Sequence, residues 1–103
     1  MHQVNASDLD AHANRVAAEL AREVRAEMAR QLISNRELSR RLEAVGYPKS
    51  EPTISRITRG TQGLTAVDLI MICGVLGVSP AEMVAQATKV AEENEQGGTD
   101  GQH

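Results

Sequence analysis

Apolar residues recur every three or four positions through most of the chain, which is the spacing of amphipathic helices. The longest such segment runs to about Ile33, and its apolar stripe comprises Leu9, Ala13, Val16, Leu20, Val24, Met28 and Leu32. Shorter segments follow over about 34–45, 50–59, 65–76 and 79–95. No segment has the alternating pattern of a strand, so the sequence predicts an all-α fold of five helices.

Each predicted helix begins at a residue whose side chain can accept a hydrogen bond from the free N–H groups of a first helical turn. These residues are Asn5 or Ser7, Ser34, Ser50, Thr65 and Ser79. Glu37, Asp68 and Glu82 stand three residues after three of them, which is the spacing of a capping box. Gly46, Gly60 and Gly77 end the three central helices.

The predicted core is aliphatic, because the chain has one Tyr and no Phe or Trp. The fourth segment is apolar on nearly all sides, which predicts the most buried helix, with Val67, Leu69, Ile70, Ile72, Val75 and Leu76. Elsewhere we expect Leu38, Leu42, Val45, Met83, Val84, Ala87 and Val90 to face inward. Cys73 is the single cysteine, which excludes an intramolecular disulfide and predicts a small buried hydrophobe.

One domain over residues 1–95 accounts for the five helices, and residues 96–103 read as a disordered acidic tail. The first residues lack the basic start and apolar stretch of a secretion signal. No run approaches the ~18 apolar residues of a membrane span. We therefore expect a cytoplasmic protein without a membrane partner, and the lone cysteine fits a reducing compartment.

The net charge of −3 is distributed unevenly along the chain. Residues 91–103 carry four acidic residues and no Lys or Arg, whereas residues 30–60 carry seven basic and three acidic residues, a local net charge of +4. A basic surface can attract a polyanion even on an acidic protein. A solvated set of helix faces gives the same counts, so charge alone leaves both interpretations open.

The segment SEPTISRITRG, residues 50–60, is a polar helix between two apolar ones. On a helical wheel, Ile54 and Ile57 share one side and would hold the helix on the core. The opposite side carries Pro52, Ser55, Arg56 and Arg59, with Glu51 and Thr53 on the flanks. Arginine can fork to guanine O6 and N7 in a major groove, and Ser and Thr are adaptable partners. Many surface helices look similar, so the wheel alone is weak evidence for DNA binding.

The surrounding segments add a family resemblance. The stretches ISNRELSRRL, TISRITRG and LTAVDLIMICGVLGVSPAEMV, within about Val24–Ala85, resemble the lambda-repressor-like helix-turn-helix family of Cro/repressor-type phage and bacterial regulators. The resemblance covers about 60 of the 103 residues and implies a helix-turn-helix over 34–60. The stretch EAVGYPKSEPT is longer than the usual tight turn of this family. In this it resembles the longer turns of actinobacterial and phage members.

The resemblance implies a role for each polar residue around the motif. Base contacts would come from Glu51, Thr53, Ser55 and Arg56. Phosphate contacts would come from Ser34, Asn35, Arg36, Lys49, Ser50, Arg59, Thr61 and Gln62. Other interpretations of single residues stay open: Ser34 and Ser50 can serve as helix caps alone, and Arg59 can pair with Asp68. Arg40 and Arg41 are expected to pair with Glu37 or Glu43 instead.

Enzyme chemistry is not predicted. His2, His12 and His103 lie near the ends of the chain without metal-ligand spacing. The sequence has no Gly-rich phosphate loop, nucleophile elbow or HExxH motif. We therefore expect no catalysis, no cofactor, no metal and no small-molecule ligand.

The predicted function is sequence-specific binding of double-stranded DNA by a transcriptional regulator, a phage repressor or Cro-like protein. It would act as a homodimer that occludes an operator. Two other functions stay open: an antitoxin of a toxin–antitoxin pair, and a helical protein-interaction module without DNA binding. The first helix is longer than the family core needs, so its apolar stripe requires a cover, either a second protomer or the fifth helix.

Overall fold

The computed structural model describes residues 5–100, with side chains described as far as Glu95. It consists of α1 (Ala6–Arg30), α2 (Asn35–Ala44), α3 (Glu51–Arg59), α4 (Ala66–Leu76) and α5 (Pro80–Asp100). No strand occurs among these residues, so the predicted all-α class with five helices is confirmed.

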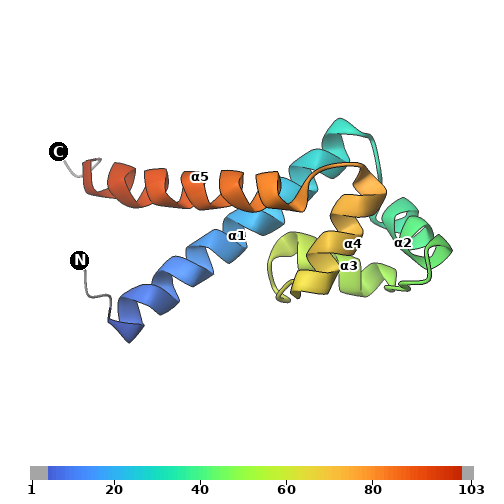
Figure 1. The fold of residues 1–103 in the computed structure, drawn as a ribbon, viewed down its shortest axis with the longest axis horizontal. Coiled ribbons are helices and arrows are strands. Elements are labelled where there is room, and N and C mark those ends of the chain that lie inside the picture. Colours follow the sequence, from blue (N-terminus) through green and yellow to red (C-terminus); the bar gives the residue numbers. More distant parts are fainter. Residues whose placement is uncertain (1–4, 101–103) are drawn as a thin grey trace.

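The two long helices, α1 and α5, run antiparallel, and the three short helices gather at the end of α1 where α2 begins (Figure 1). α3 packs against α1 and α2, while α4 packs against α2 and α5. The contact between α1 and α5 continues far along both helices, where His12 Nδ1 and Arg15 Nε lie 3.0 and 2.9 Å from Glu95 Oε2. α5 therefore packs along α1, but the α1 stripe is covered only in part, since Leu9 is 58% exposed and Ala13 is also exposed.

One apolar cluster connects the five helices. Val24 of α1, Leu38 of α2, Ile54 of α3, Ile72 of α4 and Met83 of α5 are all buried within it. Ile57 joins Ile54 in this cluster, and both are only 1% exposed, so the predicted anchoring of α3 by two isoleucines is confirmed. Cys73 is fully buried as predicted, and burial raises the pKa of its thiol.

Several apolar residues predicted to face inward lie on the surface instead. Val67 and Ile70 of α4 are 54% and 57% exposed, because neighbouring helices cover only the side of α4 that carries Ile72 and Leu76. The prediction that Val67 and Ile70 face the core is therefore wrong, whereas Ile72, Cys73 and Leu76 of the same helix are buried. Val45 is also exposed, because α2 ends at Ala44 and the backbone turns away, and Val84 lies at the surface of α5.

The two long helices end at other positions than the sequence predicts. α1 ends at Arg30 rather than near Ile33. α5 continues as helix to Asp100, past residue 95, where the sequence predicts that order ends. The Glu and Gln residues up to Gln96 favour helix, whereas Gly97 and Gly98 do not, and the predicted tail is helical over 96–100. Residues 101–103 lie outside the described residues.

Leu32, two residues after the end of α1, has a backbone conformation that favours glycine. Its φ is +57°, and its side chain is 92% exposed. The N–H groups of Leu32 and Ile33 donate to the carbonyls of Ala29 and Met28, which is the hydrogen-bond pattern of a helix end with a left-handed residue. Such a conformation costs an L-residue about 1–2 kcal/mol.

We expect the Leu32→Gly variant to be more stable than the wild type by about 0.5–1 kcal/mol, because glycine removes the steric cost while its greater freedom in the unfolded chain offsets part of the gain. Urea unfolding followed by circular dichroism measures the change. Leu32→Ala is the matched control, since it removes the same exposed side chain but retains a Cβ. Equal stabilities of the two variants would show that the backbone at residue 32 is unstrained.

Candidate nucleic-acid interface

α3 is held at both ends by its own caps. The Ser50 hydroxyl accepts a hydrogen bond from the Thr53 backbone N–H at 3.3 Å. At the other end Gly60 has a φ of +76°, and its N–H donates toward the carbonyls of Arg56 and Ile57. Both caps agree with the sequence prediction, and they fix the length of this short helix.

A contact from α1 further restrains the last turn of α3. The guanidinium of Arg25 donates to the backbone carbonyl of Thr58, a residue that is itself buried. The Thr58 hydroxyl donates to the carbonyl of Ser55 at 3.2 Å. α3 is therefore fixed to α1 by a polar contact in addition to its two buried isoleucines.

The outer side of α3 carries the polar residues that the helical wheel places there. Glu51, Pro52, Arg56 and Arg59 are exposed, and Thr53 and Ser55 are half-buried. Arg56 Nε donates to Gln62 Oε1 at 3.0 Å, and Arg56 Nη2 donates to Thr53 Oγ1 at 3.2 Å. The Arg56 side chain thus lies on the surface and is not covered by other segments of the described chain.

Arg59 and Thr61 lie next to Arg56 at the end of α3. Arg59 Nε donates to the carbonyl of Ser55 at 3.3 Å, and the Thr61 hydroxyl donates to the carbonyl of Arg56 at 3.3 Å. The alternative pairing of Arg59 with Asp68 is wrong, because Asp68 is buried among other partners. Both guanidinium groups on this side of α3 lack a carboxylate partner among the described side chains.

A buried carboxylate ties the turn between α2 and α3 to the start of α4. Asp68 is 2% exposed, and its Oδ1 accepts from the Tyr47 hydroxyl at 2.5 Å and lies 3.2 Å from Lys49 Nζ. Its Oδ2 accepts from the Thr65 N–H at 3.1 Å, while the Thr65 hydroxyl accepts from the Asp68 N–H, which completes the predicted capping box. The Lys49 ammonium also lies 5.1 Å from the centre of the Tyr47 ring.

These contacts shift the pKa values of two groups. Burial alone would raise the pKa of Asp68, but hydrogen bonds from Tyr47, the Thr65 backbone and Lys49 outweigh it and leave that pKa below its usual value. The hydrogen bond to Asp68 raises the pKa of the Tyr47 phenol. The sequence predicts a phosphate contact for Lys49, but in the structure its ammonium forms an ion pair with the Asp68 carboxylate.

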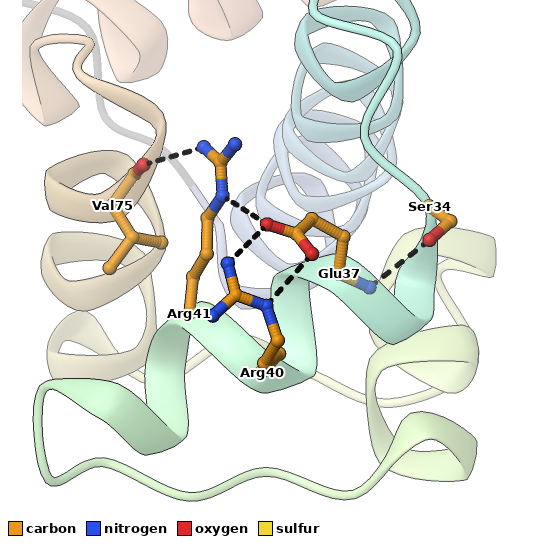
Figure 2. Close-up of polar contacts among 5 residues, drawn as sticks. All are labelled: Ser34, Glu37, Arg40, Arg41 and Val75. Atoms are coloured by element: carbon orange, nitrogen blue, oxygen red, sulfur yellow. Dashed lines mark hydrogen bonds and ion pairs between the residues drawn. The ribbon is translucent and has the colours of Figure 1, made fainter.

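At the start of α2, Ser34 acts as the predicted cap, since its hydroxyl accepts from the Glu37 N–H at 3.1 Å. The Glu37 carboxylate does not complete a capping box, because it binds Arg40 Nη2 at 2.7 Å and Arg41 Nε at 2.9 Å (Figure 2). Arg41 also reaches the Val75 carbonyl of α4 (Figure 2). The predicted pairing of both arginines with Glu37 is thus confirmed, and hydrogen bonds from them lower the pKa of Glu37 to about 2.

The start of α2 and the end of α3 border the same surface hollow. Its lining includes Ser34 and Asn35 from α2, Thr58 from α3 and Arg25 from α1. Asn35 is half-buried and Arg36 is exposed, and Arg36 makes no ion pair among the described side chains. The beginning of α2 thus lies near Thr58 in the last turn of α3.

One comparison with known proteins gives a match. The family model described as a domain of unknown function, DUF6471, matches residues 16–81. The chain belongs to the DUF6471 family. No curated protein and no solved structure matches it. The DUF6471 match includes α2, α3, α4 and every residue of the candidate interface, and it leaves out the first part of α1 and most of α5.

The sequence did not predict three residues that hold the candidate interface of the DUF6471 chain in place. They are Arg25, Tyr47 and Asp68, the last through its contacts with Tyr47 and Lys49. Their contacts join residues far apart in the sequence, such as Arg25 with Thr58, so no local spacing predicts them. A signal was present only at Asp68, where a capping acid stands within an otherwise apolar segment.

The described part of the DUF6471 chain was also searched for a metal site and for a membrane-spanning helix. No group of three or more His, Cys, Asp and Glu side chains there could hold a metal ion. No single described helix is long and apolar enough to cross a membrane, and α4 with α5 meets that test only as a pair bent by 111°.

Proposed function

We propose that this DUF6471 protein is a transcriptional regulator that binds double-stranded DNA sequence-specifically through a helix-turn-helix of Cro/repressor type. The proposal rests on the way in which α3 is fixed to the core and exposes its polar side. Two isoleucines that are 1% exposed fix it to the core, while Arg56 and Arg59 project from its outer side without a carboxylate partner in the described residues. A short, rigid helix with a guanidinium-bearing side suits a major groove.

The remaining residues take roles around this helix. Free N–H groups at the start of α2, with Ser34, Asn35 and Arg36, would meet a phosphate, where the helix dipole also favours an anion. Thr53, Ser55 and Glu51 would face bases beside Arg56. Lys49 would have to leave Asp68 to reach a phosphate, so we expect its contribution to be the weakest of the basic residues. Regulation would follow from occlusion of an operator by a homodimer.

Selection of bound sequences from random duplex DNA tests the proposal. We expect an enriched motif with two related half-sites about one helical turn apart. Binding to a fluorescent duplex of that sequence should weaken about 100-fold or more between 50 and 200 mM salt, because each neutralised phosphate releases counterions. A scrambled duplex is the control, and it should bind more weakly at every salt concentration. Absence of any enriched sequence would refute DNA recognition.

A second candidate is a helical protein-interaction module without DNA binding. The outer side of α4 supports it, because Val67 and Ile70 are more than half exposed on a helix whose other side is buried. Apolar surface of this kind is typical of protein contacts. The same selection separates the candidates, since a module without DNA binding would enrich no duplex and would bind its partner with little salt dependence.

A further inference from the structure

Gln62 lies just beyond α3, and the loop that contains it folds back over Arg56. The backbone N–H groups of Thr61 and Gln62 both donate to the Arg56 carbonyl, at 2.9 and 3.3 Å. The Gln62 side chain, which is half-buried, accepts from Arg56 Nε at 3.0 Å. Backbone and side chain of the loop thus hold the same residue.

The Nη2 nitrogen of the Arg56 guanidinium is held from within α3. Arg56 Nη2 donates to Thr53 Oγ1 at 3.2 Å, and the Thr53 hydroxyl lies 2.9 Å from the hydroxyl of the cap, Ser50. A guanidinium has five N–H donors and no acceptor. With Nε–H and one Nη2–H engaged, the two N–H groups of Nη1 and one of Nη2 remain at the outer end of the side chain.

These remaining donors form an end-on fork. Guanine presents two acceptors, O6 and N7, side by side in the major groove, and a bidentate arginine is their commonest specific partner. An exposed arginine normally samples many rotamers, which costs free energy to suppress on binding. The Gln62 and Thr53 contacts restrict Arg56 before any duplex arrives. The orientation of the Gln62 amide is also fixed, because only its oxygen can face a group that has donors alone.

We infer that Gln62 is a positioning residue, which orients Arg56 for a guanine and does not act as an independent phosphate contact. The inference rests on the proposed function, and it names the base that Arg56 would read. It differs from the phosphate contact that the family resemblance implies for Gln62: the side-chain oxygen accepts from Arg56, and the variants below test whether the amide N–H groups also reach a phosphate.

Two substitutions of similar size separate positioning from phosphate contact. Gln62→Met retains the length of the side chain but has no strong acceptor, whereas Gln62→Glu retains an acceptor facing Arg56. We expect Gln62→Met to lower the preference for guanine at one base pair by about 3–10-fold, the size of a lost hydrogen bond. Preferences at other positions should be unchanged. Gln62→Glu should retain that preference, even though its negative charge weakens overall affinity.

The measurement is selection from random duplex DNA with the full chain and each variant, followed by titration of single-base variants of the enriched duplex. Circular dichroism confirms that each variant is folded. Loss of guanine preference in Gln62→Met, at the same base pair that Arg56→Ala affects, with rescue in Gln62→Glu, supports the inference. A uniform loss on all sequences, or no change at all, would overturn it and leave DNA binding intact. No enrichment by the wild type would refute the proposed function itself.

Discussion

The Asp68→Ala variant is expected to unfold with a free energy about 3 kcal/mol lower than that of the wild type. Asp68 is 2% exposed and accepts hydrogen bonds from Tyr47 and the Thr65 backbone while pairing with Lys49. Alanine leaves these donors without their acceptor in a site that water barely reaches. Removal of one partner of a buried ion pair costs about 3–5 kcal/mol. The lower value applies because Lys49 is 28% exposed and can regain water.

Urea unfolding at neutral pH measures this loss, with Glu43→Ala as the control for removal of an exposed carboxylate from a neighbouring helix. Glu43→Ala should change stability by no more than about 0.5 kcal/mol. Equal stabilities of the two variants would show that the Asp68 contacts contribute nothing.

The same contacts predict how stability depends on pH. The folded-state pKa of Asp68 is lowered, so the stability that it contributes is complete above its ordinary pKa of about 3.9 and is lost as the pH falls through the lower, folded value. Glu37, with a pKa of about 2, acts in the same direction. The wild type should therefore lose stability between about pH 4 and pH 2, and Asp68→Ala should lose less over this range because one of the carboxylates with a lowered pKa is gone.

Local signals predicted the elements that position the interface. Ser34, Ser50 and Thr65 are caps in the structure as the sequence indicates, because capping depends only on groups three residues apart. Ile54 and Ile57 were predictable as anchors for a similar reason, since α3 has no other large apolar side chain to bury.

Which side of an apolar helix is covered could not be predicted from spacing. α4 has apolar residues around most of its circumference, so periodicity gives no reason to expect Ile72 inside and Ile70 outside. The positions of α2 and α5 decide this, and those depend on the whole fold. The cover of the α1 stripe is similar, because the sequence left a second protomer and the fifth helix as candidates, and the structure places α5 beside α1 while Leu9 stays exposed.

Which basic residues near the interface form ion pairs also depends on the fold and could not be predicted from the sequence. The count of basic residues over 30–60 treats all seven alike, yet Arg30, Arg40, Arg41 and Lys49 are paired with carboxylates. Arg36, Arg56 and Arg59 have no carboxylate partner among the side chains of residues 5–95. Only an unpaired guanidinium can bind an anion without first giving up a partner. The charge that matters for a polyanion is therefore smaller than the sequence indicates, and it is concentrated at the start of α2 and the end of α3.

Substitution of Arg56 by alanine is expected to weaken binding to the selected duplex by about 10–100-fold, which corresponds to about 1–3 kcal/mol. The reason is the loss of a bidentate contact from a side chain that Gln62 and Thr53 hold on the surface of α3. Fluorescence anisotropy with the enriched duplex and its single-base variants measures the effect. The variant should also lose its preference at one base pair, while the salt dependence of binding should stay close to that of the wild type.

Arg59→Ala is the matched control for that result, because it removes a neighbouring exposed arginine that would contact the backbone of the duplex. Its affinity should fall by a similar factor on every sequence, and the slope of log K against log salt should decrease in magnitude by about 1. If Arg56→Ala shows this uniform pattern instead, Arg56 is a phosphate contact and base recognition lies elsewhere on α3. If both variants bind as tightly as the wild type, the outer side of α3 does not face DNA.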